Sequence, residues 1–177
     1  DDGRWNSIGT SYYSNSEAGA TIGFAASGYG RVSLWARFTG VQFTGTPTIT
    51  VATLSLKANA TASATVVNLS VTAIDSDDPT APTSSADAAG RAQTTATVAW
   101  SGVGTWTAGT WYSPADISAI IQELVDSYNY VASAKAMVIY VLGAVDSTAG
   151  RQPATYEVAA ADAPKLHIEY TAGGVTV

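Results

Sequence analysis

Apolar and polar residues alternate along several short stretches of the chain. In the clearest stretch, 32–39, Leu34, Ala36 and Phe38 alternate with Trp35, Arg37 and Thr39. The same period of two recurs in 49–58 and 65–73, and 92–100, 136–142 and 165–170 also have strand character. Period two with small polar residues on one side is typical of strands that bury one face in an antiparallel sheet. We therefore predict an all-β fold, an antiparallel β-sandwich of the jelly-roll-like kind.

One segment has a helical pattern instead. Ser113 is a suitable N-cap, Pro114 would occupy the first helical position, and Asp116 the third. The apolar residues then recur at helical spacing in a single stripe: Ile117, Ile120, Ile121, Leu124, Val125 and Tyr128. The pattern predicts one accessory α-helix at about 114–128, lying across an end or edge of the sheets and sealing the core.

Three segments lack a clear period. Residues 1–30 are polar and rich in Gly and Ser, 75–91 contain Pro79 and Pro82, and 171–177 contain the pair Gly173-Gly174. We interpret 75–91 as a long extended loop and 171–177 as a short tail on a hinge. The chain of 177 residues is expected to form a single domain, with 1–30 as an interface segment.

The composition excludes much chemistry. Charged residues make up 12% of the chain, against roughly 25% in ordinary domains. With no cysteine and His167 as the single histidine, the chain cannot form a Cys–His pair or a multi-histidine metal site. The net charge of −6 argues against nucleic acid as a partner, and no run of about 18 apolar residues supports membrane insertion. We expect a protein that is not an enzyme.

Five stretches together resemble a known kind of module. They are D-D-G-R-W at 1–5, L-W-A-R-F-T-G-V at 34–41, T-I-T-V-A-T-L-S-L at 48–56, W-T-A-G-T-W-Y-S-P-A-D-I-S-A-I-I-Q-E-L-V at 106–125 and A-P-K-L-H-I-E-Y at 163–170. In this order they resemble a β-sandwich module of phage virion proteins and bacterial surfaces, similar in outline to DNRLRE-type jelly-roll carbohydrate-binding domains. The tryptophan-to-helix block at 106–125 is its most specific part.

The resemblance implies a non-enzymatic role in attachment, decoration or assembly, at an extracellular or virion surface. The expected function is that of a structural subunit, of tail, decoration or filament type, that self-associates through its termini and sheet edges. Its expected partners are other copies of itself. The alternative function is a carbohydrate-binding module that attaches a surface to glycans. Glycans or another virion or surface protein are the further candidate partners. The resemblance brings no catalytic residues.

Aromatic residues supply the candidate interface and ligand sites. Four aromatic residues lie in weakly patterned sequence and are expected to be exposed: Trp5, Tyr12, Tyr13 and Tyr29. Exposed aromatic rings suit a protein interface or a surface on which a sugar ring stacks. The tryptophans near the helix, Trp100, Trp106 and Trp111, are expected to fill the core, each with an acceptor for its N–H.

Carboxylates supply the remaining candidates. Asp75, Asp77 and Asp78 are clustered as Ca²⁺ ligands would be, but they lack EF-hand spacing, so we expect no metal and no cofactor. Glu123 and Asp126 are expected on the solvated side of the helix, and His167 on the opposite strand face from Leu166 and Ile168. Either terminal segment could add a strand to a neighbouring subunit or pair within its own sandwich.

Overall fold

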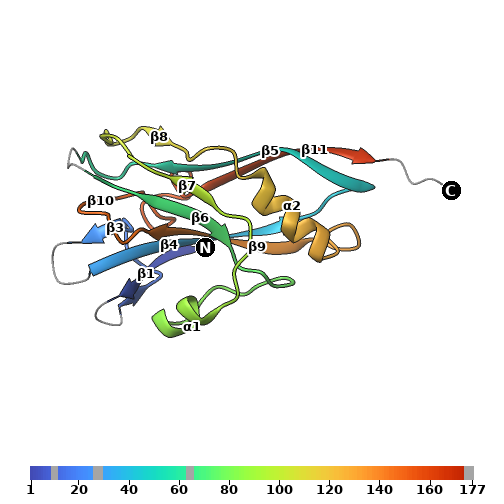
Figure 1. Cartoon of the computed structure of the whole chain (residues 1–177), viewed down its shortest axis with the longest axis horizontal. Coiled ribbons are helices and arrows are strands. Elements are labelled where there is room, and N and C mark those ends of the chain that lie inside the picture. Colours follow the sequence, from blue (N-terminus) through green and yellow to red (C-terminus); the bar gives the residue numbers. More distant parts are fainter. Residues whose placement is uncertain (9–11, 26–29, 63–65, 174–177) are drawn as a thin grey trace.

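The computed structural model describes residues 1–8, 12–25, 30–62 and 66–173, and it shows two packed antiparallel sheets (Figure 1). The strands are β1 (Asp2–Ile8), β2 (Tyr13–Ser14), β3 (Ile22–Ala25), β4 (Gly30–Val41), β5 (Thr46–Lys57), β6 (Leu69–Ala73), β7 (Val98–Trp100), β8 (Trp111–Tyr112), β9 (Lys135–Gly143), β10 (Gly150–Arg151) and β11 (Lys165–Gly173). The helices are α1 (Ser85–Gly90) and α2 (Ser118–Ser127). The predicted all-β sandwich is confirmed.

The larger sheet has eight strands built around β4. Leu34 of β4 pairs with Arg4 of β1 and with Val141 of β9, so these two strands flank β4 on opposite sides. Beyond β9 the sheet continues through β6 to β7, and β2 pairs with the other side of β1. The short strands β3 and β10 extend the sheet beside the first residues of β4.

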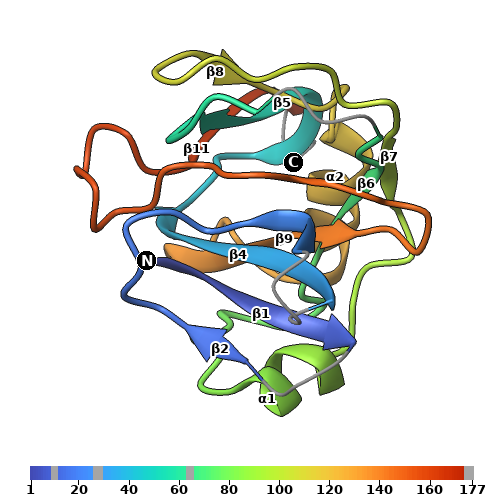
Figure 2. The same cartoon turned by 90° about the vertical axis from the view of Figure 1, so that its left-hand side faces the viewer.

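The smaller sheet has three strands in the order β11-β5-β8. Its inner face packs on the larger sheet, and the two layers are seen edge-on in Figure 2. The connection between β10 and β11 links the layers, since Ala154 donates its N–H to Lys57 O at 2.7 Å and Pro153 O accepts from Ala20 N. This contact closes the sandwich on that side.

Alternating apolar residues from both sheets form the main core. Leu34, Leu54, Leu56, Val71 and Ile139 are all at most 1% exposed, as their period predicts. Burying a Leu or Ile side chain contributes about 1.5–3 kcal/mol, so this inner row is the main source of stability. Helix α2 covers the open end between the sheets and adds its own buried residues, Ile120, Ile121 and Leu124.

Helix α2 begins four residues later than the sequence pattern indicates. Its N-cap is Ile117, without a side-chain hydrogen bond, instead of Ser113. Asp116 explains the difference, because its Oδ1 accepts from Ser118 N at 2.8 Å and from Ala52 N at 2.9 Å. Ile117 N in turn donates to Ala52 O, so this segment follows β5 before the helix starts.

Two polar side chains of α2 attach the helix to both sheets. Gln122 Oε1 accepts from Ile49 N of β5 at 2.7 Å. Glu123 accepts from Thr95 N and Ala96 N, ahead of β7, through both carboxylate oxygens at 2.7 Å. Glu123 is therefore half-buried and engaged by backbone donors, whereas Asp126 is exposed as expected.

The outer face of the larger sheet is also covered, contrary to the alternation-based prediction. Trp35 was expected on a polar outer face, yet it is 1% exposed, in a second apolar cluster with Trp5, Ile74, Ala88, Val138 and Tyr140. The cover comes from the segment 75–91, which is not a loop throughout but contains α1, and Tyr13 of β2 stacks on the Trp35 ring. A Cβ at Gly3 would lie 2.8 Å from the Trp35 ring, so glycine permits this close packing.

Helix α1 has the capping that α2 lacks. Ser84 Oγ accepts from Asp87 N at 3.1 Å, and Asp87 Oδ2 accepts from Thr83 N at 2.8 Å. Tyr140 OH then donates to Ala88 O, which fixes the helix on the sheet.

Candidate functional site

Strand β11 is the longest strand edge that the described part of the chain leaves open. It has nine residues and pairs on one side with β5. The register shift in this pair skips Thr50 of β5, because Glu169 pairs with Val51 and Tyr170 with Ile49. The extra residue belongs to β5, so β11 itself is a regular strand. The other terminal strands, β2, β7, β8 and β10, have two or three residues each.

Backbone hydrogen bonds show which groups of β11 point away from β5. Ile168 pairs with Ala52, whose N–H is taken by Asp116 and whose carbonyl accepts from Ile117. Both groups of Ala52 therefore face away from β11, and the N–H and C=O of Ile168 likewise face outward, as in a non-hydrogen-bonded antiparallel pair. Alternation assigns the same outward direction to Leu166 and Tyr170. These three residues form a row of backbone donors and acceptors at the sheet edge.

The two faces of β11 differ in chemistry. Lys165, His167 and Glu169 are exposed on the outer face, and His167 Nε2 lies 3.1 Å from Glu169 Oε1. The opposite orientation of His167 from its neighbours is confirmed. Leu166 and Ile168 face the core but stay half-buried, because the three-stranded sheet ends at this strand. An open backbone row next to a half-covered apolar row is the arrangement that accepts a further strand.

The aromatic candidates lie elsewhere, and they are less exposed than predicted. Trp5 is 1% exposed and contacts Tyr140 with ring centroids 4.5 Å apart, so it is a core residue. Tyr13 is half-buried, stacks on Trp35 and donates its OH to Pro82 O. Tyr12 is half-buried, donates to Glu17 and lies under the Arg4 guanidinium. Tyr29 lies outside the described residues.

Of the three tryptophans near the helix, Trp106 fills the core as predicted. It is 1% exposed and stacks on Tyr112 at 4.8 Å, whereas Trp100 and Trp111 are half-buried. The expected acceptor is absent among the described residues, since Trp106 Nε1 has no hydrogen-bond partner there.

Each of the three carboxylates in the acidic stretch 75–78 has a separate partner. Asp75 accepts from Tyr128 OH at 2.9 Å, Asp77 pairs with Lys135, and Asp78 accepts from Ala136 N at 2.8 Å. Within the described ranges no group of three or more His, Cys, Asp or Glu residues is arranged to hold a metal ion. The three carboxylates fasten this loop to β9 and to Tyr128, the residue that follows α2.

A small cavity lies beside the first residues of β1. Its volume is about 160 Å³, and it is lined by Asp1, Asp2, Asn15, Trp35, Ala81 and Glu157. Asp2 Oδ2 accepts from Tyr156 N at 3.0 Å. Asp2 Oδ1 and Trp35 Nε1 are buried and have no hydrogen-bond partner among the described residues. Two residues that line this cavity thus each carry a buried polar atom without a partner, which is costly.

Asp2 is electrostatically unusual. Burial raises the pKa of its carboxyl from 3.8 to about 6, the Tyr156 N–H bond opposes this, and the nearby Glu157 charge adds to it. Desolvation disfavours the charged form of a carboxyl group, which accounts for the direction.

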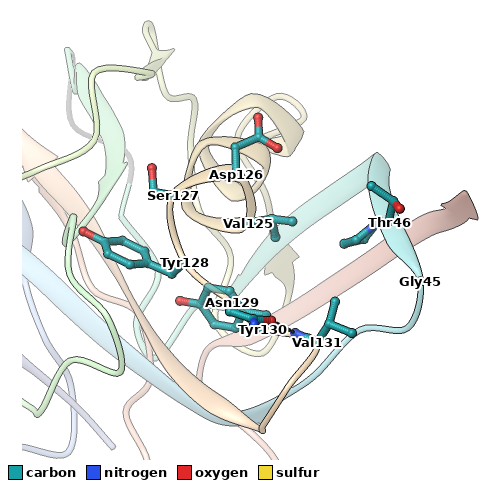
Figure 3. Close-up of a pocket in the computed structure, with 10 residues that line it drawn as sticks. Gly45, Thr46, Val125, Asp126, Ser127, Tyr128, Asn129, Tyr130 and Val131 are labelled. Atoms are coloured by element: carbon teal, nitrogen blue, oxygen red, sulfur yellow. Dashed lines mark hydrogen bonds between the residues drawn. The ribbon is translucent and has the colours of Figure 1, made fainter. Parts of the chain in front are cut away.

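A second hollow lies between the β4–β5 turn and the end of α2 (Figure 3). It measures about 360 Å³ and is lined by Gly45, Thr46, Pro47 and residues 125–131. Asp126 supplies the one charged side chain of this lining, and its Oδ1 accepts from Gln122 Nε2 at 2.7 Å. Acid–base catalysis by a pair of carboxylates would need a second one, which the described lining of this hollow does not have.

Sequence reasoning missed Trp35 and Asp2, and it expected open sheet edges without identifying β11 as one. Trp35 was detectable as a large aromatic on a face otherwise predicted to be polar. Asp2 carried no such sign, because its burial depends on Tyr156, which lies 154 residues away. The edge position of β11 depends likewise on pairing with a distant strand.

None of the described helices is long and apolar enough to cross a membrane. Comparison of the sequence with protein-family models and with curated proteins gave no match.

Proposed function

We propose that the chain is a non-enzymatic structural module that associates with copies of itself through the open edge of β11. The observation that supports the proposal is the outward row of backbone groups at Leu166, Ile168 and Tyr170. Such a module suits an extracellular or virion-surface assembly, in keeping with the low charge of the chain.

Physical arguments favour this edge over the other strands. A long, regular edge strand is a template for pairing, and proteins that avoid pairing protect such edges with proline, charged side chains, bulges or a cover. The charged residues of β11, Lys165 and Glu169, have opposite signs and lie on its exposed face, so they do not by themselves repel a second strand. Within β11 there is no proline, and the bulge lies on β5. Each backbone hydrogen bond gained contributes about 0.5–1.5 kcal/mol net, and burial of the half-exposed Leu166 and Ile168 adds to it.

The test removes one outward N–H. Ile168→Pro deletes the donor, at an edge where proline is tolerated, and Ile168→Ala removes a similar amount of side chain while keeping the donor. Sedimentation velocity at protein concentrations up to about 1 mM should show association of the wild type and of Ile168→Ala. A Kd of about 1 mM corresponds to a binding free energy of about 4 kcal/mol. Ile168→Pro should stay monomeric with an unchanged circular dichroism spectrum. A monomeric wild type, or association of a folded proline variant, would contradict the proposal.

A second candidate function is binding of a small polyhydroxylated molecule in the cavity beside Asp2. Asp2 and Trp35 line the cavity, and each carries a buried polar atom, an acceptor and a donor, that lacks a partner among the described residues. Hydroxyl groups of a ligand would satisfy both atoms once these side chains turn towards the cavity. The cavity of about 160 Å³ accommodates a ligand the size of one sugar ring or about five waters.

Calorimetric titration with neutral mono- and disaccharides tests this second function. Trp35→Phe keeps an aromatic ring but removes the N–H, and Trp111→Phe on β8 is the matched control. Binding to the wild type and the control but not to Trp35→Phe would support it. Absence of heat with every saccharide would leave water as the occupant and reject the function.

A further inference from the structure

The geometry of β11 also determines how two copies would pair, an inference that rests on the proposed self-association. A closed dimer has a two-fold axis, which makes β11 antiparallel to its own copy. The outward backbone groups of Leu166, Ile168 and Tyr170 must then face one another across the axis. In a register that places an outward residue opposite an inward one, the outward N–H and C=O groups of neither strand face a partner.

Like charges exclude one register. A two-fold axis at Glu169 would place two carboxylates directly opposite each other on the exposed face, which is destabilising. Glu169 already faces His167 on its own strand, and its side chain is 60% exposed.

Registers centred on Leu166 or on Tyr170 would place at least one of the three outward residues opposite a position beyond the ends of β11. The registers centred on His167 and on Ile168 are left to compare. Centring on His167 places Pro164 opposite Tyr170, and proline has no N–H to donate. Centring on Ile168 pairs Ile168 with itself and Leu166 with Tyr170, so each rung has all its donors. It also places His167 opposite Glu169 of the other copy, which brings together residues of opposite charge when the imidazole is protonated.

We propose that two copies join their β11 strands antiparallel about a two-fold axis at Ile168, with His167 of each copy opposite Glu169 of the other. The pairing continues the three-stranded sheet of each copy into one six-stranded sheet. The half-buried side chains of Leu166, Ile168 and Tyr170 are then covered by their counterparts on the core side.

Cysteine cross-linking tests the register, because the chain contains no cysteine of its own. His167 and Glu169 are exposed on the outer face, so His167→Cys and Glu169→Cys leave the core intact. Across the axis the two positions form a non-hydrogen-bonded pair with Cα atoms about 4.5 Å apart, within disulfide range. Mixing the two variants under mild oxidation should give a heterodimer disulfide, and neither variant alone should cross-link to a comparable extent.

The outcomes separate the register from the function. A homodimer disulfide of His167→Cys alone would move the axis to His167 and overturn the register. Failure of the mixture to cross-link, while the wild type associates and Ile168→Pro does not, would also overturn the register but leave the function standing. A wild type that stays monomeric would overturn both.

Discussion

The first and last strands of the chain, β1 and β11, differ in how their outer edges are covered. Strand β1 pairs with β2 on its outer side, has a register shift between Asn6 and Ile8, and receives a hydrogen bond from Ser85 of α1. Strand β11 is regular, and its outer edge has no strand partner in the described part of the chain. Figure 2 shows them at different layers of the molecule. Since the fold covers one edge and leaves the other open, the open edge is the more plausible place for function.

The pairing of β1 shows which of the two alternatives its backbone adopts. Either end was expected to add a strand to a neighbouring copy or to pair within its own sandwich. Strand β1 pairs within its own sandwich, with β4. At the other end, Thr171, Ala172 and Gly173 belong to β11, so the predicted tail begins later than residue 171. Residues 174–177 lie outside the described part of the chain.

The largest expected effect is at the covered edge. Trp5→Ala should lower the free energy of unfolding by about 3–5 kcal/mol, because it opens a cavity next to Tyr140 in the outer cluster. Urea denaturation would measure the loss. Trp111→Ala, at a half-buried ring on β8, is the control and should lose less. Equal losses would mean that the outer cluster does not hold β1 in place.

Asp2→Asn should stabilise the protein at neutral pH. Burial raises the pKa of Asp2 in the folded state from 3.8 to about 6. The protonated carboxyl of Asp2 therefore contributes to the free energy of unfolding in full below about pH 4, and this contribution is lost as the pH rises through 6. The variant should gain on the order of 1–2 kcal/mol at pH 7 relative to pH 4. Melting curves of both proteins from pH 4 to 7 would measure the difference, and parallel profiles would contradict it.

Asp87→Asn should have a smaller effect with the opposite dependence on pH. A hydrogen bond from the Arg91 side chain lowers the pKa of Asp87 from 3.8 to about 2. Its stabilising contribution is present above pH 4 and lost as the pH falls towards 2. Wild type and variant should therefore differ at pH 5 and converge near pH 2, which urea denaturation can follow. A difference that persists at pH 2 would assign the role of Asp87 to packing.

The local pattern was informative about strands and uninformative about their neighbours. The alternation in 32–39 and 165–170 correctly predicted two strands, because in–out periodicity is a property of the local chain. It could not show that Trp35 would be covered by the segment that contains α1, since this comes from a distant part of the sequence. The start of α2 was misplaced for the same reason, because Asp116 binds Ala52 of β5. An open edge likewise cannot be recognised from the local pattern, because it depends on the pairing of all the strands.

Hydrogen exchange at single residues of β11 tests the central claim most directly. The N–H groups of His167 and Glu169 point to β5, whereas those of Leu166, Ile168 and Tyr170 point outward. Raising the protein concentration should slow exchange at the outward three and leave the inward two unchanged. Outward groups that exchange at the same rate at every concentration, while the protein associates, would show that the copies meet elsewhere.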